Sequence, residues 1–170
     1  DFCESHPSET RKVNVEGTLN VARACRQLGA RMIFYSSDYV FDGVQGSYTE
    51  EDAPCPINEY GRQKAETEAG VLAYDPRNLV LRTSGAYGWQ WEPKNFVLQI
   101  KTRLSAGQPM TVAEDLRYNP TYVENLAEIT AALAESGASG VFHCVGAEEI
   151  ARYDFAVLVA RAFKLDESLL

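Results

Sequence analysis

The chain has 170 residues, 45% hydrophobic and 24% charged, with a formal net charge of −8, which is ordinary for a folded globular protein. This acidic balance, without a Lys/Arg cluster, argues against nucleic acid or an anionic membrane as a partner. No run approaches the roughly 18 apolar residues of a membrane-spanning helix. The spacing of Cys3, Cys25, Cys55 and Cys144 fits no zinc pattern, so we expect no metal site and a reducing, cytoplasmic location.

Helical and strand patterns alternate along the chain. Apolar residues recur at helical spacing in residues 6–28, and Gly29 follows as a stop signal. The apolar run 31–35 predicts a buried strand, followed by a long loop over 36–57. Further helices are predicted at 58–73, 95–105, 123–135 and 153–163, and further strands at 78–82 and 141–145. This alternation indicates an α/β fold with a parallel sheet.

The beginning of the chain differs from a complete dinucleotide-binding fold, which starts with a strand, a glycine-rich turn and a helix. Residues 1–5 lead directly into the first predicted helix, and no such glycine triplet occurs. We therefore expect a Rossmann-like sheet whose N-terminal βαβ portion is missing here. The chain is then a single domain fragment, with the second half of the Rossmann-like domain in 1–84 and a mixed, partly substrate-binding region in 85–170. By itself it should bind dinucleotide weakly, because the glycine-rich helix N-terminus that holds a pyrophosphate is absent.

Two side chains on the second predicted helix suggest proton chemistry. Tyr60 and Lys64 lie one helical turn apart and share a face. An ammonium near a phenol lowers the pKa of the phenol, which can then act as a general acid or base. Ser36, Ser37 and Asp38 follow the first predicted strand, where ligands of open α/β sheets bind. A surface helix pair and a polar turn remain as alternatives from spacing alone.

The stretch Tyr35–Lys64, YSSDYVFDGVQGSYTEEDAPCPINEYGRQK, resembles the extended short-chain dehydrogenase/reductases. It is most similar to their dTDP-4-dehydrorhamnose reductase branch, which also includes the regulatory beta subunit of methionine adenosyltransferase. Further similar segments are NVEGTLNVA from Asn14, LRTSGAYG at Leu81–Gly88 and NPTYVENLAEI at Asn119–Ile129. Together they cover nearly the whole chain in the expected order.

The resemblance implies a reductase of a nucleotide-linked 4-keto sugar that uses NADP or NAD. Tyr60 is then the general acid, and Lys64 binds the nicotinamide ribose and lowers the pKa of Tyr60. Ser37 orients the substrate carbonyl, with Asp38 beside it. The remaining residues that the resemblance assigns are Asn14, Ser36, Thr83 and Ser84 near the cofactor, and Asn95, Phe96 and Arg117 near the substrate.

One departure and two alternatives leave the reaction open. Gly85 stands where the reductase branch usually has Trp, which removes a contact on the sugar side. An epimerase or dehydratase would use the same Tyr and Lys, although Tyr39 rather than Glu after Asp38 favours a reductase. A non-catalytic regulatory subunit is the other alternative. The resemblance also implies a homodimer through the helices near 7–28 and 58–73.

Overall fold

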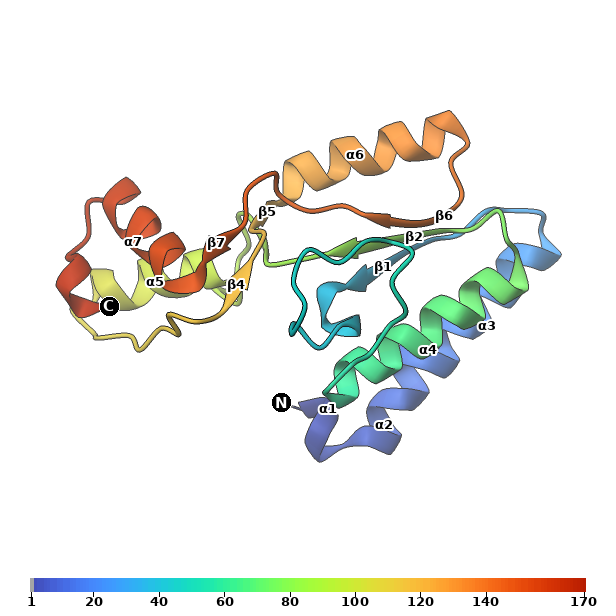
Figure 1. Cartoon of the computed structure of the whole chain (residues 1–170), viewed down its shortest axis with the longest axis horizontal. Helices are drawn as coiled ribbons and strands as arrows, with labels where there is room; N and C mark the ends of the chain where they lie inside the picture. Colours follow the sequence, from blue (N-terminus) through green and yellow to red (C-terminus); the bar gives the residue numbers. More distant parts are fainter. Residues whose placement is uncertain (1) are drawn as a thin grey trace. The chain divides into compact units, whose positions relative to one another are not determined.

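The computed structural model describes residues 2–170 and divides them into two compact units (Figure 1). The first unit runs to Thr83 and includes Ile129–Cys144, and the second contains Ser84–Glu128 and Val145–Leu170. Each unit is described by itself.

A three-stranded parallel sheet forms the centre of the first unit. Its strands are β1 (Ile33–Ser37), β2 (Leu79–Thr83) and β6 (Gly140–His143), in the order β1-β2-β6. The middle strand carries fully buried Leu79, Val80 and Leu81, as expected for a strand covered on both faces. The predicted α/β class with a parallel sheet is therefore confirmed.

Helices cover the two faces of this sheet. On one side, α3 (Thr18–Gln27) and α4 (Glu59–Tyr74) pack together, and the buried residues there are Ala22, Phe34, Val71 and Val80. The part of helix α6 (Val123–Ser136) that belongs to this unit, from Ile129 onwards, lies across the sheet from them (Figure 1). The alternation of β1 points Tyr35 the opposite way from Phe34, and its hydroxyl bonds Thr130 Oγ1 of α6 at 2.9 Å.

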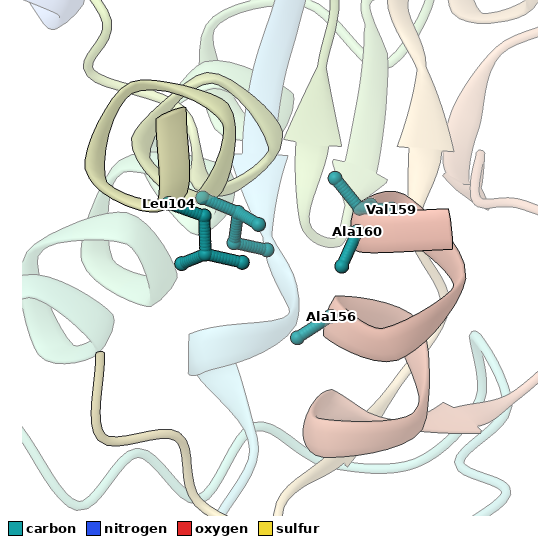
Figure 2. Packing of buried hydrophobic residues seen from close by; sticks show 5 residues of the cluster. Leu104, Ala156, Val159 and Ala160 are labelled. Carbon is teal, nitrogen blue, oxygen red and sulfur yellow. The ribbon is translucent and has the colours of Figure 1, made fainter. Parts of the chain in front are cut away.

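The second unit has its own apolar core between α5 (Phe96–Ser105) and α7 (Arg152–Ala162). Figure 2 shows this packing, in which Leu104 faces Ala156 and Ala160. Two small strand pairs complete the unit. Strand β3 (Ala86–Tyr87) runs parallel to β5 (Thr121–Tyr122), and β4 (Arg117–Tyr118) runs antiparallel to β7 (Ile150–Ala151).

Several predicted boundaries were wrong. The first strand extends through Ser37 because β2 pairs with it as far as Thr83, so Ser36 and Ser37 end the strand rather than follow it. A 3₁₀ turn, Asp38–Val40, occupies the start of the predicted loop, and a last one lies at Glu167–Leu169. The first predicted helix, over residues 6–28, consists of α2 (Pro7–Arg11), a π-helical segment (Lys12–Gly17) and α3. A further short helix, α1 (Phe2–Ser5), precedes it.

Candidate active site

The two residues that follow Ser37 fix its hydroxyl at the carboxyl end of β1. Ser37 donates a hydrogen bond from Oγ to Asp38 Oδ1 at 3.0 Å and accepts one from the Tyr39 N–H at 3.3 Å. Ser37 thereby caps the 3₁₀ turn that follows the strand, in the way that Ser caps helices. The buried hydroxyl is held at the sheet edge where ligands of open α/β folds bind.

Helix α4 begins in close contact with this turn. The Asn58 side chain accepts a hydrogen bond from the Gly61 N–H at 2.8 Å, and the Glu4 carboxylate accepts one from the Glu59 N–H. A Cβ atom at Gly61 would lie only 2.0 Å from the Tyr39 carbonyl oxygen. Glycine is therefore required for the helix to approach the turn so closely at the residue next to Tyr60.

The Tyr60 phenol faces Ser37. Its ring lies edge-on to Tyr39, with the ring centroids 5.9 Å apart. Burial raises the pKa of Tyr60 above its ordinary value, and the Asp38 charge raises it further. A hydrogen bond with the Ser37 side chain lowers the pKa of Tyr60. The phenol is accordingly protonated at neutral pH.

Lys64 lies on the same face of α4, but it points at the backbone. Its Nζ donates to the Tyr35 carbonyl oxygen at 2.7 Å and lies 4.6 Å from the centroid of the Phe34 ring and 5.6 Å from that of Tyr60. Burial lowers the pKa of Lys64, while the Glu68 carboxylate raises it. The net pKa of Tyr60 is raised because burial of the phenol is the largest influence on it, and a lowering effect of Lys64 on this pKa stays a prediction.

Two further hydroxyls fit a ligand at this edge. Ser36 Oγ and Thr83 Oγ1, at the carboxyl ends of the adjacent strands β1 and β2, are buried and have no hydrogen-bond partner within residues 2–170. Buried polar groups are normally satisfied, so an orphaned hydroxyl indicates a missing partner. Hydroxyls of this kind can hydrogen-bond the hydroxyl and amide groups of a nicotinamide nucleoside, and strand alternation points these two to opposite faces of the sheet.

Asn14 reaches the site through another residue. Its Nδ2 donates to Gln63 Oε1 at 2.9 Å and to Cys3 Sγ at 3.9 Å, and its carbonyl oxygen accepts from Thr67 Oγ1 at 3.3 Å. Sequence reasoning missed Gln63 and Gly61 as parts of this arrangement. A glycine inside a helical pattern was the available signal for Gly61, and no local pattern marked Gln63.

The other predicted residues lie in the second unit and take part in its own packing. The Ser84 carbonyl oxygen accepts from Thr121 Oγ1 at 2.6 Å. Asn95 caps α5 by accepting from the Leu98 N–H at 3.1 Å, and its Nδ2 donates to the Gly88 carbonyl oxygen at 2.7 Å.

Phe96 and Arg117 are also engaged in the second unit. The centroid of the Phe96 ring lies 4.1 Å from the guanidinium carbon of Arg152. Arg117 is an exposed residue that forms an ion pair with Glu149. A ligand would therefore have to bind Phe96 and Arg117 beside their present partners, Arg152 and Glu149, or displace these partners.

The structure shows why glycine occupies position 85, where the reductase branch usually has Trp. Its φ is +49°, and a Cβ atom there would lie 2.3 Å from Cε2 of Tyr118. The Tyr118 ring thus fills the space that a larger side chain at position 85 would need. Burial raises the pKa of Tyr118 to about 12, so its hydroxyl stays protonated.

Trp89 and Trp91 are 72% and 90% exposed and contact each other edge-on, with ring centroids 4.8 Å apart. Within residues 2–170 no three His, Cys, Asp or Glu side chains come together as metal ligands. In the same range, every helix is too short or too polar to cross a bilayer.

Comparison with known proteins points to one family. The family model described as "RmlD substrate binding domain" matches residues 1–170. The chain is 35% identical to methionine adenosyltransferase 2 subunit beta of Bos taurus, over 99% of this chain and 52% of that protein. It is 38% identical to dTDP-4-dehydrorhamnose reductase of Mycobacterium tuberculosis, over 90% of this chain and 52% of that protein.

A solved structure agrees with these relatives. The dTDP-4-dehydrorhamnose reductase of Bacillus anthracis, in complex with NADP, superposes with a TM-score of 0.93 and 28% identity, over 98% of this chain and 59% of that one. The chain spans about half the length of the curated relatives that it matches.

Proposed function

Because the chain belongs to the RmlD substrate binding domain family, we propose that it is part of an NAD(P)-dependent oxidoreductase that reduces the 4-keto group of a nucleotide-linked sugar. The observation that carries the proposal is the arrangement of Ser37, Tyr60 and Lys64 at the carboxyl edge of the parallel sheet. The M. tuberculosis relative and the NADP complex of the B. anthracis structure support the same reaction class.

Tyr60 is the general acid of the proposed reaction. A bound reduced nicotinamide supplies the hydride that the carbonyl carbon receives. As the C–H bond forms, the C=O π bond breaks, and Tyr60 transfers its phenolic proton to the carbonyl oxygen. The Tyr60 phenol carries its proton at neutral pH, as a proton donor must before turnover. The Lys64 ammonium then stabilises the phenolate that remains, since opposite charges at short range attract.

Ser37 orients the carbonyl in this proposal. Its single hydroxyl proton, now donated to Asp38, would turn to the substrate oxygen as negative charge develops there. Ser36, Thr83 and Ser84 are proposed to border the cofactor. On the substrate side, Asn95 and Phe96 are proposed contacts, and Arg117 would leave Glu149 to pair with phosphate.

The test is turnover by the intact protein. Purified protein is mixed with NADPH or NADH and a dTDP-linked 4-keto sugar, and loss of the reduced cofactor is followed together with formation of the 4-hydroxy sugar. We expect equal amounts of cofactor oxidised and alcohol formed. An epimerase or dehydratase would convert the sugar without net cofactor oxidation, which would refute the reductase.

A second candidate function is favoured by one observation. The 35% identity to the beta subunit of methionine adenosyltransferase covers 99% of this chain. A regulatory subunit would bind the dinucleotide without turnover and would co-purify with a methionine adenosyltransferase catalytic subunit. Pull-down and titration calorimetry on the same preparation distinguish this candidate from the reductase.

We also propose a cytoplasmic homodimer that pairs α2, α3 and α4. Val13, in the π-helical segment, and Val21, on α3, are exposed apolar residues, and no disulfide joins the cysteines of residues 2–170. Light scattering on the intact protein and on Val21→Glu tests the dimer. A wild-type monomer would refute it.

A further inference from the structure

Gln63 lies between Tyr60 and Lys64 on α4 and is almost completely buried, with 2% of its surface exposed. Its Oε1 accepts a hydrogen bond from Asn14 Nδ2 at 2.9 Å. Its Nε2 contacts Thr10 Oγ1 at 2.9 Å, the Pro7 carbonyl oxygen at 3.3 Å and Glu59 Oε1 at 3.0 Å. One amide thus joins the helix of the acid–base pair to the neighbouring helical segment.

The partners of Gln63 follow one line along that segment. Pro7, Thr10 and Asn14 are spaced by three and four residues, the spacing of side chains on one helical face. A buried amide must satisfy both its donor and its acceptor, so it tolerates few orientations. Contacts at three positions along about two turns of the neighbouring segment restrict the rotation of α4 about its axis. Because Tyr60 and Lys64 lie on the adjacent face of α4, the same contacts restrict where they point.

Asn14 is connected to the site by this route. Its side-chain amide donates hydrogen bonds to Gln63 Oε1 and Cys3 Sγ, and its carbonyl oxygen accepts one from Thr67 Oγ1. Asn14 belongs to the π-helical segment Lys12–Gly17, and π-helical turns within helices are frequent at functional sites.

We propose that Gln63 is a positioning residue that sets the orientation of Tyr60 and Lys64, and that Asn14 acts through Gln63 rather than as a separate proton carrier. The inference rests on the proposed function, since it assigns Gln63 a part in the proton transfer by Tyr60. It predicts that removing the hydrogen bonds of Gln63 alters the orientation of the phenol. It also predicts that Asn14 contributes little once Gln63 is gone.

The first test reads orientation without activity. Gln63→Met keeps the length of the side chain and removes its hydrogen bonds. In NMR spectra of the intact protein, with Tyr60 signals assigned by Tyr60→Phe, we expect the contacts between the Tyr39 and Tyr60 rings to weaken in Gln63→Met. Val71→Ala, a buried change further along α4, serves as the control for lost stability and should leave these contacts unchanged. Unchanged ring contacts in a folded Gln63→Met variant would overturn the inference.

The second test is kinetic. In Gln63→Met we expect kcat to fall about 10- to 100-fold, because small misplacements of reacting groups are costly, with KM changed less than about twofold. Adding Asn14→Ala should then lower kcat no further, whereas multiplicative losses would show that Asn14 works independently. If the wild-type protein lacks turnover, the proposed function fails, and the ring contacts still decide the inference about Gln63.

Discussion

Gly61→Ala tests whether the close approach of α4 to the 3₁₀ turn positions the phenol. The added Cβ would meet the Tyr39 carbonyl oxygen at 2.0 Å and Pro56 Cβ at 2.9 Å. Real Cβ contacts are essentially never shorter than 3.0 Å. The obstacle is a backbone carbonyl that cannot rotate away, so helix and turn must separate by at least about 1 Å.

The size of the effect follows from that displacement. Overpacking of this kind costs about 1–3 kcal/mol of unfolding free energy. A shift of about 1 Å between reacting groups can lower the rate by about 100-fold. We therefore expect Gly61→Ala to fold with reduced stability and to lose about two orders of magnitude in kcat. Urea unfolding and steady-state kinetics of the intact protein measure the two effects.

Gly70→Ala is the matched control on the same helix. Its Cβ would lie 2.5 Å from Cδ2 of Leu19, the end of a flexible side chain that can turn away. Alanine also favours a helix interior over glycine by about 1 kcal/mol. This variant should keep wild-type kcat. If Gly61→Ala is as active as Gly70→Ala, the approach of α4 to Tyr39 does not position the phenol, and the reasoning is wrong.

Three further changes test charges in the first unit. Asp38→Asn removes a charge that raises the pKa of Tyr60. Because activity is lost as pH rises through that pKa, the basic limb of the kcat–pH profile should move to lower pH. A basic limb at the wild-type pH would contradict the effect of the Asp38 charge on Tyr60. Glu68→Leu leaves the buried Arg82 guanidinium without its 2.7 Å partner and should cost about 3–5 kcal/mol in urea unfolding, whereas adding Arg82→Met should recover part of this loss. Hydrogen bonds from Arg77 hold the pKa of Asp75 below its usual value, so its contribution to stability is present above about pH 4 and is lost as pH falls through the lower folded pKa. Asp75→Asn should flatten that acid dependence in melting curves, and an unchanged dependence would exclude Asp75 as its source.

The placement of the candidate site residues on helix and strand was predictable where it depends on local periodicity. The four-residue spacing of Tyr60 and Lys64 places them on one face of a helix, and the apolar run before Ser37 indicates a strand end. The alternation of helices and strands was enough to predict the parallel sheet. These features depend on short-range geometry that any chain must obey.

Other features depend on residues that are distant in the sequence. Gln63 gives no local signal, because its partners lie about fifty positions earlier. The direction of the Tyr60 pKa shift depends on burial, which spacing does not reveal. The paired strands at Arg117–Tyr118 and Ile150–Ala151 contain two residues each, too few to show a period.

The most direct test compares wild-type protein with Tyr60→Phe. The change removes only the phenolic oxygen, so NADPH affinity measured by calorimetry should stay within about twofold, while kcat for reduction of the keto sugar should fall about 100- to 10,000-fold. If Tyr60→Phe reduces the sugar at the wild-type rate, Tyr60 is not the proton donor and the proposed mechanism is contradicted.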